Sequence, residues 1–135
     1  MAKNLELEIG GVVHQFRAGF DFIDAVEPLT KQTQNGYTEE VGLNKILYGL
    51  QEGDARDLAT ALYYMNKGDD KRLSMKAVQQ YIEDHEDIEK LFTTVKDFLL
   101  SSNCTKLKIK KATLRTLMIE KNLETSLGGN SETNA

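Results

Sequence analysis

Hydrophobic and polar residues alternate at the start of the chain. Over residues 5–9, leucine or isoleucine occupies every second position and glutamate the positions between, which is the period of a strand with one buried face. Gly10-Gly11 follows, and glycine readily adopts the positive φ angles that a two-residue hairpin turn requires. We therefore predict a β-hairpin over residues 4–16, whose apolar face must rest on helices because a lone hairpin is marginal in water. The predicted cross-strand pairs on that face are Ile9–Val12, Leu7–His14 and Leu5–Phe16.

Apolar residues then recur at helical spacing. The first such pattern covers Asp21–Gln32. Pro28 lies inside it, where proline removes a backbone hydrogen bond and costs roughly 3 kcal/mol in a regular helix, so we expect a kink or an early stop. Residues 33–36 are predicted to form a loop. Thr38 is predicted to cap a second helix, with two glutamates in its first turn, and Gly53 to end it.

Three further helices are predicted from their caps. Asp54 caps the third, which residues 68–70 close, and Ser74 caps the fourth. Asp84 is predicted to begin the fifth, with Asp87 three residues later in a pattern like a capping box. Burying the six apolar side chains of the fifth helix contributes on the order of 10 kcal/mol before chain entropy is subtracted, so we expect it to be the centre of packing. These side chains are Ile88, Leu91, Phe92, Val95, Phe98 and Leu99.

The pattern is ambiguous after residue 104. Two apolar residues alternate with lysines over residues 105–111, which suits a strand, whereas three others suit a helix over residues 112–123. Residues 125–135 contain one leucine and no other large apolar residue, so a disordered tail is predicted there. The apolar residues concerned are Leu107 and Ile109 in the first segment, and Leu114, Leu117 and Met118 in the second.

These elements predict an α+β fold that is mainly α, in a single globular domain over residues 1–124. Its parts are the hairpin, a bundle of about five helices over residues 20–104, and a basic segment with a possible helix over residues 105–124. A length of 135 residues, with 40% hydrophobic and 28% charged residues, is ordinary for one soluble domain. No apolar run long enough to span a membrane is present, and we expect no secretion signal at the start.

Charge is unevenly distributed along the chain. Residues 1–104 carry 11 basic and 18 acidic residues, whereas residues 105–135 carry 6 basic and 3 acidic residues. A basic end on an acidic body can fold back, dock on a neighbouring copy or meet an acidic partner. Cys104 is the single cysteine, so no internal disulfide is possible and a reducing compartment is expected.

Catalytic and metal-binding patterns are missing from the sequence. A zinc peptidase helix needs a second histidine four residues after the first, and position 89, four residues after His85, is Glu89. A calcium loop needs a central glycine, and no glycine lies between Gly68 and Gly128. His14 is interpreted as a packing residue. We therefore predict no catalytic residue, no cofactor and no metal.

A basic strip begins just after residue 104 and consists of Lys106, Lys108, Lys110, Lys111 and Arg115. Nucleic-acid sites usually add aromatic side chains that stack on bases, but no aromatic residue follows Phe98 and the acidic body would repel phosphates. Contact with a protein is therefore favoured over nucleic acid, and a solvated or internally paired face is left open.

Several short sequences occur together along the chain: Phe16–Phe20, Leu58-Ala59, Ala61–Tyr64, Ser74, Ala77-Val78, Tyr81–Glu89, Leu91-Phe92 and Thr105–Lys108. Together they resemble one known family, the tail assembly chaperones of long-tailed bacteriophages, which are encoded just upstream of the tape measure protein. The resemblance covers about residues 4–111 and is most specific over residues 77–92.

The resemblance implies a function without catalysis. Such chaperones coat the aggregation-prone tape measure protein in the host cytoplasm and are absent from the mature virion. A longer form made by ribosomal frameshifting often recruits tail tube protein, and this chain would be the short form. Neither nucleic acid nor a membrane is an expected partner. The alternative is a structural head–tail or tail adaptor that stays in the virion, and a DNA-binding regulator is a more distant one.

Two surfaces are hypothesised to contact partners. Aromatic residues and methionines exceed what one face of each middle helix can bury, so some of them should line a groove for amphipathic helices, although burial in the core remains open for the tyrosines. These residues are Tyr63, Tyr64, Met65, Met75 and Tyr81. The basic strip is hypothesised to dock on the acidic residues 83–89 of a neighbouring copy, which would make a homo-oligomer.

Overall fold

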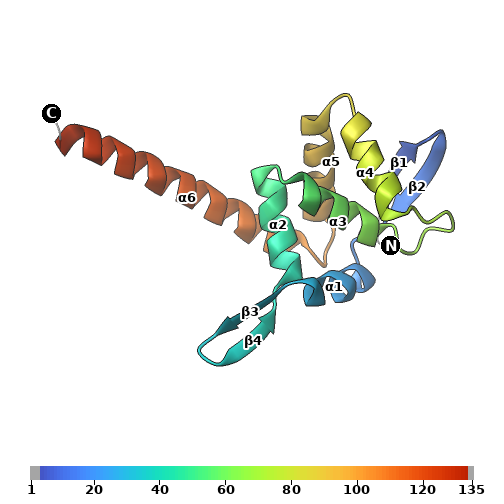
Figure 1. Cartoon of the computed structure of the whole chain (residues 1–135), viewed down its shortest axis with the longest axis horizontal. Coiled ribbons are helices and arrows are strands. Elements are labelled where there is room, and N and C mark those ends of the chain that lie inside the picture. Colours follow the sequence, from blue (N-terminus) through green and yellow to red (C-terminus); the bar gives the residue numbers. More distant parts are fainter. Residues whose placement is uncertain (1–3, 134–135) are drawn as a thin grey trace.

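The computed structural model describes residues 4–133, and their side chains as far as residue 124. It has an α+β fold that is mainly α, as predicted. A compact body carries two projections, the long helix α6 and the hairpin β3–β4 (Figure 1). The elements are β1 (Leu5–Ile9), β2 (Val12–Phe16), α1 (Phe20–Val26), the 3-10 turn η1 (Glu27–Leu29), β3 (Lys31–Gln34), β4 (Tyr37–Glu40), α2 (Gly42–Glu52), α3 (Ala55–Met65), α4 (Met75–Asp84), α5 (Ile88–Ser101) and α6 (Lys106–Thr133).

The hairpin β1–β2 confirms the predicted register. Its strands are antiparallel and pair Leu5 with Phe16, Leu7 with His14 and Ile9 with Val12. Both turn glycines have positive φ, 62° and 79°. The inner face rests on the helices, with Phe16 only 1% exposed, and the Arg17 amide just after β2 donates to the Met65 carbonyl at 2.7 Å. The hairpin is therefore held to the end of α3 by apolar packing and a backbone hydrogen bond.

The helices α2 and α3 form the centre of the core. Leu47 and Leu58, one from each helix, are completely buried. The prediction that the fifth helix would be the centre is wrong, because α5 lies at the edge: Ile88 is 40% exposed and Phe92 is only partly buried. The residues of α2 and α3 with the largest fully buried side chains are Leu43, Leu47, Leu50, Leu58, Leu62 and Met65.

Two predicted helix caps are confirmed, and a third cap differs from the prediction. An Asp54 carboxylate oxygen accepts from the Arg56 and Asp57 amides of α3, and the Ser74 hydroxyl accepts from the Ala77 amide of α4. Asp87 accepts from the Lys90 amide and is therefore the cap of α5. The fifth helix begins after Asp87 and not at Asp84, which still belongs to α4.

Between α1 and α2 the structure differs from the sequence prediction. Pro28 does stop the first helix early, since α1 ends at Val26 and the proline sits in η1. Residues 31–34, however, form β3, and Thr38 lies in β4 instead of capping a helix. The reason is Asn35-Gly36, whose φ angles of 53° and 80° make the tight turn that joins two strands. Every residue of this hairpin is exposed.

The helix α2 starts close against the end of α1. The Glu27 carboxylate accepts from the Leu43 amide at 2.8 Å, so it takes the capping role that we had assigned to Thr38. Gly42 is required there, because a Cβ atom at this position would fall on the Val26 carbonyl. The predicted end is confirmed: Gly53 adopts the left-handed conformation, with φ at 76°.

The helix α6 settles the ambiguous segment after residue 104. It begins at Lys106, so the strand alternative for residues 105–111 is wrong. Thr105, Ile109 and Ala112 are spaced for one helix face and are all buried against the body, which no strand register would allow. The helix continues through residues 125–133, where we predicted a disordered tail, and residues 134–135 lie outside the described part of the chain.

A buried polar network joins β2 to the loop between α3 and α4. Asn66 is completely buried, and its amide group donates to the Gln15 carbonyl and to the Asp69 carboxylate, both at 3.0 Å. Its side-chain oxygen accepts from the Leu73 amide at 2.7 Å. His14 lies 2.9 Å from the same carboxylate, so its predicted packing role includes a hydrogen bond. Asn66 thus holds β2 and the loop between α3 and α4 together.

Acid should destabilise the fold through Asp69. Burial acts to raise the pKa of this carboxyl, but hydrogen bonds from His14, Asn66 and the amides of Gln15 and Lys71 outweigh it and lower the pKa below the ordinary 3.8. A carboxyl with a lowered folded pKa stabilises the fold above the unfolded pKa, and this contribution disappears as the pH falls through the folded pKa. We expect the free energy of unfolding of the wild-type chain, measured by urea titration at a series of pH values below 3.8, to decrease as the pH falls. This decrease should be steeper for the wild-type chain than for the Asp69→Asn variant. Equal slopes would contradict this assignment.

Candidate functional site

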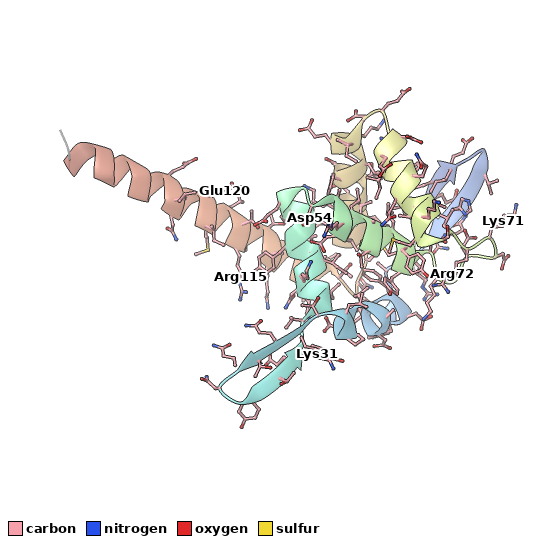
Figure 2. All side chains as sticks on the ribbon, in the orientation of Figure 1. Lys31, Asp54, Lys71, Arg72, Arg115 and Glu120 are labelled. Atoms are coloured by element: carbon pink, nitrogen blue, oxygen red, sulfur yellow. The ribbon has the colours of Figure 1, made fainter. Side chains whose placement is uncertain are left out.

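The helix α6 is anchored to the body only along its first part. Ile109 and Ala112 are buried there. The Gln51 side-chain amide donates to the Thr113 hydroxyl at 2.8 Å, and the Arg115 guanidinium donates to the Tyr48 hydroxyl at 3.1 Å. Every side chain from Leu117 to Glu124 is exposed, and we call residues 117–124 the projecting segment. Figure 2 shows Arg115 where the helix leaves the body and Glu120 on the projecting segment.

Exposed apolar side chains gather on α6. Among residues 4–124, six of the eleven large apolar side chains that are prominently exposed belong to this helix, at 56–68% exposure each. Soluble monomers rarely present extended apolar patches of this kind, and such patches mark sites of interaction. The six residues are Leu107, Leu114, Leu117, Met118, Ile119 and Leu123.

These six side chains lie on two sides of the helix. Leu107, Leu114 and Met118 are spaced at i, i+7 and i+11, so they form one row on the side away from the body, which we call the outer row. Ile119 and Leu123 instead continue the buried side, because they follow Ala112 and Thr116 by seven residues each. They are exposed only because the body ends before the helix does.

The basic strip borders the outer row. Lys108, Lys110, Lys111 and Arg115 are exposed, and Lys106 is partly buried. On the helix the strip divides in two, with Lys106 and Lys110 along one border and the other three residues along the opposite border. In the part of the chain with described side chains, neither ion pair involves a residue of α6. The predicted basic residues are thus brought together around exposed apolar side chains.

The aromatic residues nominated from the sequence occupy the opposite part of the body. Tyr63 and Tyr64 pack edge to face, with ring centroids 4.9 Å apart. The Arg72 guanidinium donates to the Tyr63 hydroxyl at 3.1 Å. Met65 lies in the core at 2% exposure and is therefore not part of any exposed surface. The nominated set is split between core and surface.

The α4 members of that set, Met75 and Tyr81, are partly buried and pack against the core. Tyr81 meets His85 edge to face at 5.3 Å between centroids, and burial raises the pKa of its phenol. These residues present part of each side chain to solvent, which suits a partner contact at the rim of a surface better than at its centre.

Two open grooves lie on the body. One, of about 760 Å³, lies between β2, α1 and the end of α3, with Phe20 at 73% exposure and Tyr64 in its lining. The other, of about 740 Å³, lies between the end of α2 and the start of α5, and includes Ile88, Phe92 and Glu89 in its lining. Both grooves combine apolar and charged side chains, so either could accept part of a polypeptide.

No group of three His, Cys, Asp or Glu side chains among the described residues could hold a metal ion. Within the same residues, no helix is both long and apolar enough to cross a membrane.

Sequence reasoning identified the basic residues of α6 but missed its exposed apolar residues as a site. Leu114, Leu117 and Met118 were read as an ordinary helix stripe, and Ile119 and Leu123 were not considered. A usable signal was present: apolar residues recur on both sides of this helix, and a helix docked on one surface can bury only one side.

Comparison with known proteins identifies a family. The sequence model of a family described as phage tail assembly chaperone protein, TAC, matches residues 6–113. The matched region contains the body and the anchored start of α6, and it stops before the projecting segment. Searches of curated proteins and of solved structures found no match.

Proposed function

The chain belongs to the phage tail assembly chaperone family, and from that premise we propose that it binds the tape measure protein and prevents its aggregation while the tail is assembled. The role is non-enzymatic. It places the protein in the host cytoplasm during assembly and outside the finished virion. A longer, frameshifted form would extend the chain beyond α6 and bring tail tube protein to the same complex.

The main support for this proposal is the exposed apolar surface of α6. A tape measure protein is a long helical rod whose apolar stripes would self-associate if left open to water. A chaperone for it must present apolar side chains that are ready to cover such stripes, and helices bind one another through anchors at i, i+3, i+4 and i+7. The outer row and the projecting segment present such anchors outside the body.

Co-expression tests the proposal directly. The tape measure protein produced alone should be insoluble, and with this chain it should stay in the soluble fraction and be recovered with it on an affinity column. A tape measure protein that aggregates equally in both cases would refute the proposal. Mass spectrometry of purified virions separates a chaperone from a structural adaptor, because an adaptor would be found in the particle at fixed stoichiometry.

The tyrosines of α3 give a further prediction. Tyr63→Ala/Tyr64→Ala should leave the helical content unchanged by circular dichroism and weaken retention of the tape measure protein about tenfold, since tyrosine is enriched among the residues that dominate binding free energy at interfaces. Tyr37→Ala, on the exposed hairpin β3–β4, is the matched control and should bind normally. Retention by the double variant at the control level would remove these tyrosines from the contact surface.

A further inference from the structure

The side of α6 that faces away from the body combines an apolar row with basic borders. Resting on the proposed function, we infer that this side recognises one class of helix, an amphipathic helix whose apolar stripe is bordered by acidic side chains. The occupant is a segment of the client, and the basic borders select it from segments of other charge.

The apolar part of the surface is the outer row. Leu107, Leu114 and Met118 are 60–68% exposed and lie along one line of the helix, with Leu117 beside them. A partner helix lying along this line would bury all of them. The surface is therefore long and narrow, which fits a helix better than a loop or a globular face.

The charged part of the surface is mainly basic. Residues 106–124 contain six basic and two acidic residues. Lys110 and Lys111 stand directly on either side of the outer row, and both are exposed. Acidic side chains bordering the stripe of a partner would meet these groups, whereas basic ones would be repelled.

Two of these lysines lie in an electrostatically unfavourable position at the start of α6. The first turn of α6 contains no acidic residue, and Lys106 and Lys108 stand where the amide ends of the helix favour negative charge. A local arrangement that is unfavourable in the free protein is often retained for function. An acidic partner would relieve this unfavourable arrangement.

Other occupants fit less well. A second α6 lying along the first would oppose basic borders with basic borders. The acidic residues 83–89 of the same chain cannot reach the outer row without breaking α6, which runs as one helix from Lys106. The same residues on a second copy carry the right charge, so the experiment is designed to separate that occupant from the client helix.

The test uses two synthetic helical peptides with the same apolar stripe, one bordered by glutamates and the other by lysines. Binding to the full chain is measured by fluorescence anisotropy at low and at high salt. Exposed charge pairs are individually weak, but several acting together should make the glutamate-bordered peptide bind about tenfold more tightly at low salt. The preference should shrink at high salt because exposed charges are screened.

Charge-reversed variants locate the effect. Lys110→Glu/Lys111→Glu leaves residues 106–124 with four basic and four acidic side chains, so it should abolish the preference for the glutamate-bordered peptide. Lys71→Glu/Lys76→Glu changes the net charge equally and should keep the original preference. Its two residues are exposed, and Figure 2 shows Lys71 on the opposite side of the body from Arg115.

Three results would overturn the inference. The wild-type chain could bind both peptides equally, or the α6 variant could keep the original preference. Alternatively, the wild-type chain could show no peptide preference while sedimentation shows that it self-associates and that the α6 variant does not. That result would assign the surface to contact with a second copy of the chain. Co-expression keeps the two proposals apart: a wild-type chain that does not protect the tape measure protein refutes the proposed function, whatever the peptides show.

Discussion

Replacing four exposed apolar side chains of α6 by glutamine is expected to abolish protection of the tape measure protein and to leave the fold intact. The four residues are Leu114, Leu117, Met118 and Leu123. All four side chains are more than half exposed. Exposed substitutions usually change stability by no more than about 0.5 kcal/mol, and glutamine is a good helix former. Burying each apolar side chain against a partner would contribute roughly 1.5–3 kcal/mol. Losing all four should weaken binding by about a thousandfold or more.

The measurement is the soluble fraction of co-expressed tape measure protein, with circular dichroism and sedimentation of the variant alone. Glutamine at three exposed apolar positions outside α6 and outside both grooves is the control and should leave protection unchanged. Protection by the α6 variant at the wild-type level would show that the client binds another surface, with the two grooves of the body as the next candidates. The control positions are Val13, Leu29 and Tyr37.

Asn66→Ala is expected to cause the largest loss of stability of any single substitution considered. The side chain is completely buried and makes three hydrogen bonds. Alanine would leave the Leu73 amide and the Gln15 carbonyl without their partner, and each unsatisfied buried group costs about 1–3 kcal/mol. We expect a total loss of about 2–4 kcal/mol, which is a large part of the roughly 5–15 kcal/mol that stabilises a typical domain.

Urea denaturation followed by circular dichroism measures this loss as a lower midpoint. Asn44→Ala is the matched control, because Asn44 is exposed on α2 and should change the midpoint little. Equal midpoints for the two variants would show that water replaces Asn66 in the network. The stability of the contact between β2 and the α3–α4 loop would then depend on apolar packing alone.

The sequence was sufficient where local chemistry and tertiary packing agree. The β1–β2 register followed from alternation and from Gly10-Gly11, because shifting the pairing by one residue would turn every apolar side chain to solvent. The caps at Asp54 and Ser74 followed from side chains that satisfy free amides at helix starts. The family resemblance placed on residues 4–111 is confirmed by the match over residues 6–113.

The hairpin β3–β4 was missed because only its turn residues indicate it and no hydrophobic pattern does. Residues 31–40 carry no apolar alternation, since every one of them is exposed and no buried face imposes a period. The Asn35-Gly36 turn was the one available indicator, and it was read as part of a loop. Thr38 and the two glutamates after it match the pattern of a helix start. The side chain that caps α2, however, is that of Glu27, which precedes Leu43 by 16 residues.

The site could be predicted only in part, for a different reason. Periodicity shows which side chains a helix could bury, but not whether a neighbouring element is present to bury them. Ile119 and Leu123 continue a buried side beyond the body, and Met65 lies in the core despite its position beside two half-exposed tyrosines. Which of these faces is covered depends on where the body ends, and that is a property of the whole fold.

The unbroken run of α6 also acts as a spacer. A helix rises 1.5 Å per residue, so its 28 residues hold the two ends about 40 Å apart. Residues 117–133 extend past the body, so anything joined after this helix would begin about 25 Å beyond the body, attached through a stiff helix instead of a flexible linker. An affinity tag or fluorophore fused at this end should therefore leave the N-terminal hairpin and both grooves unobstructed.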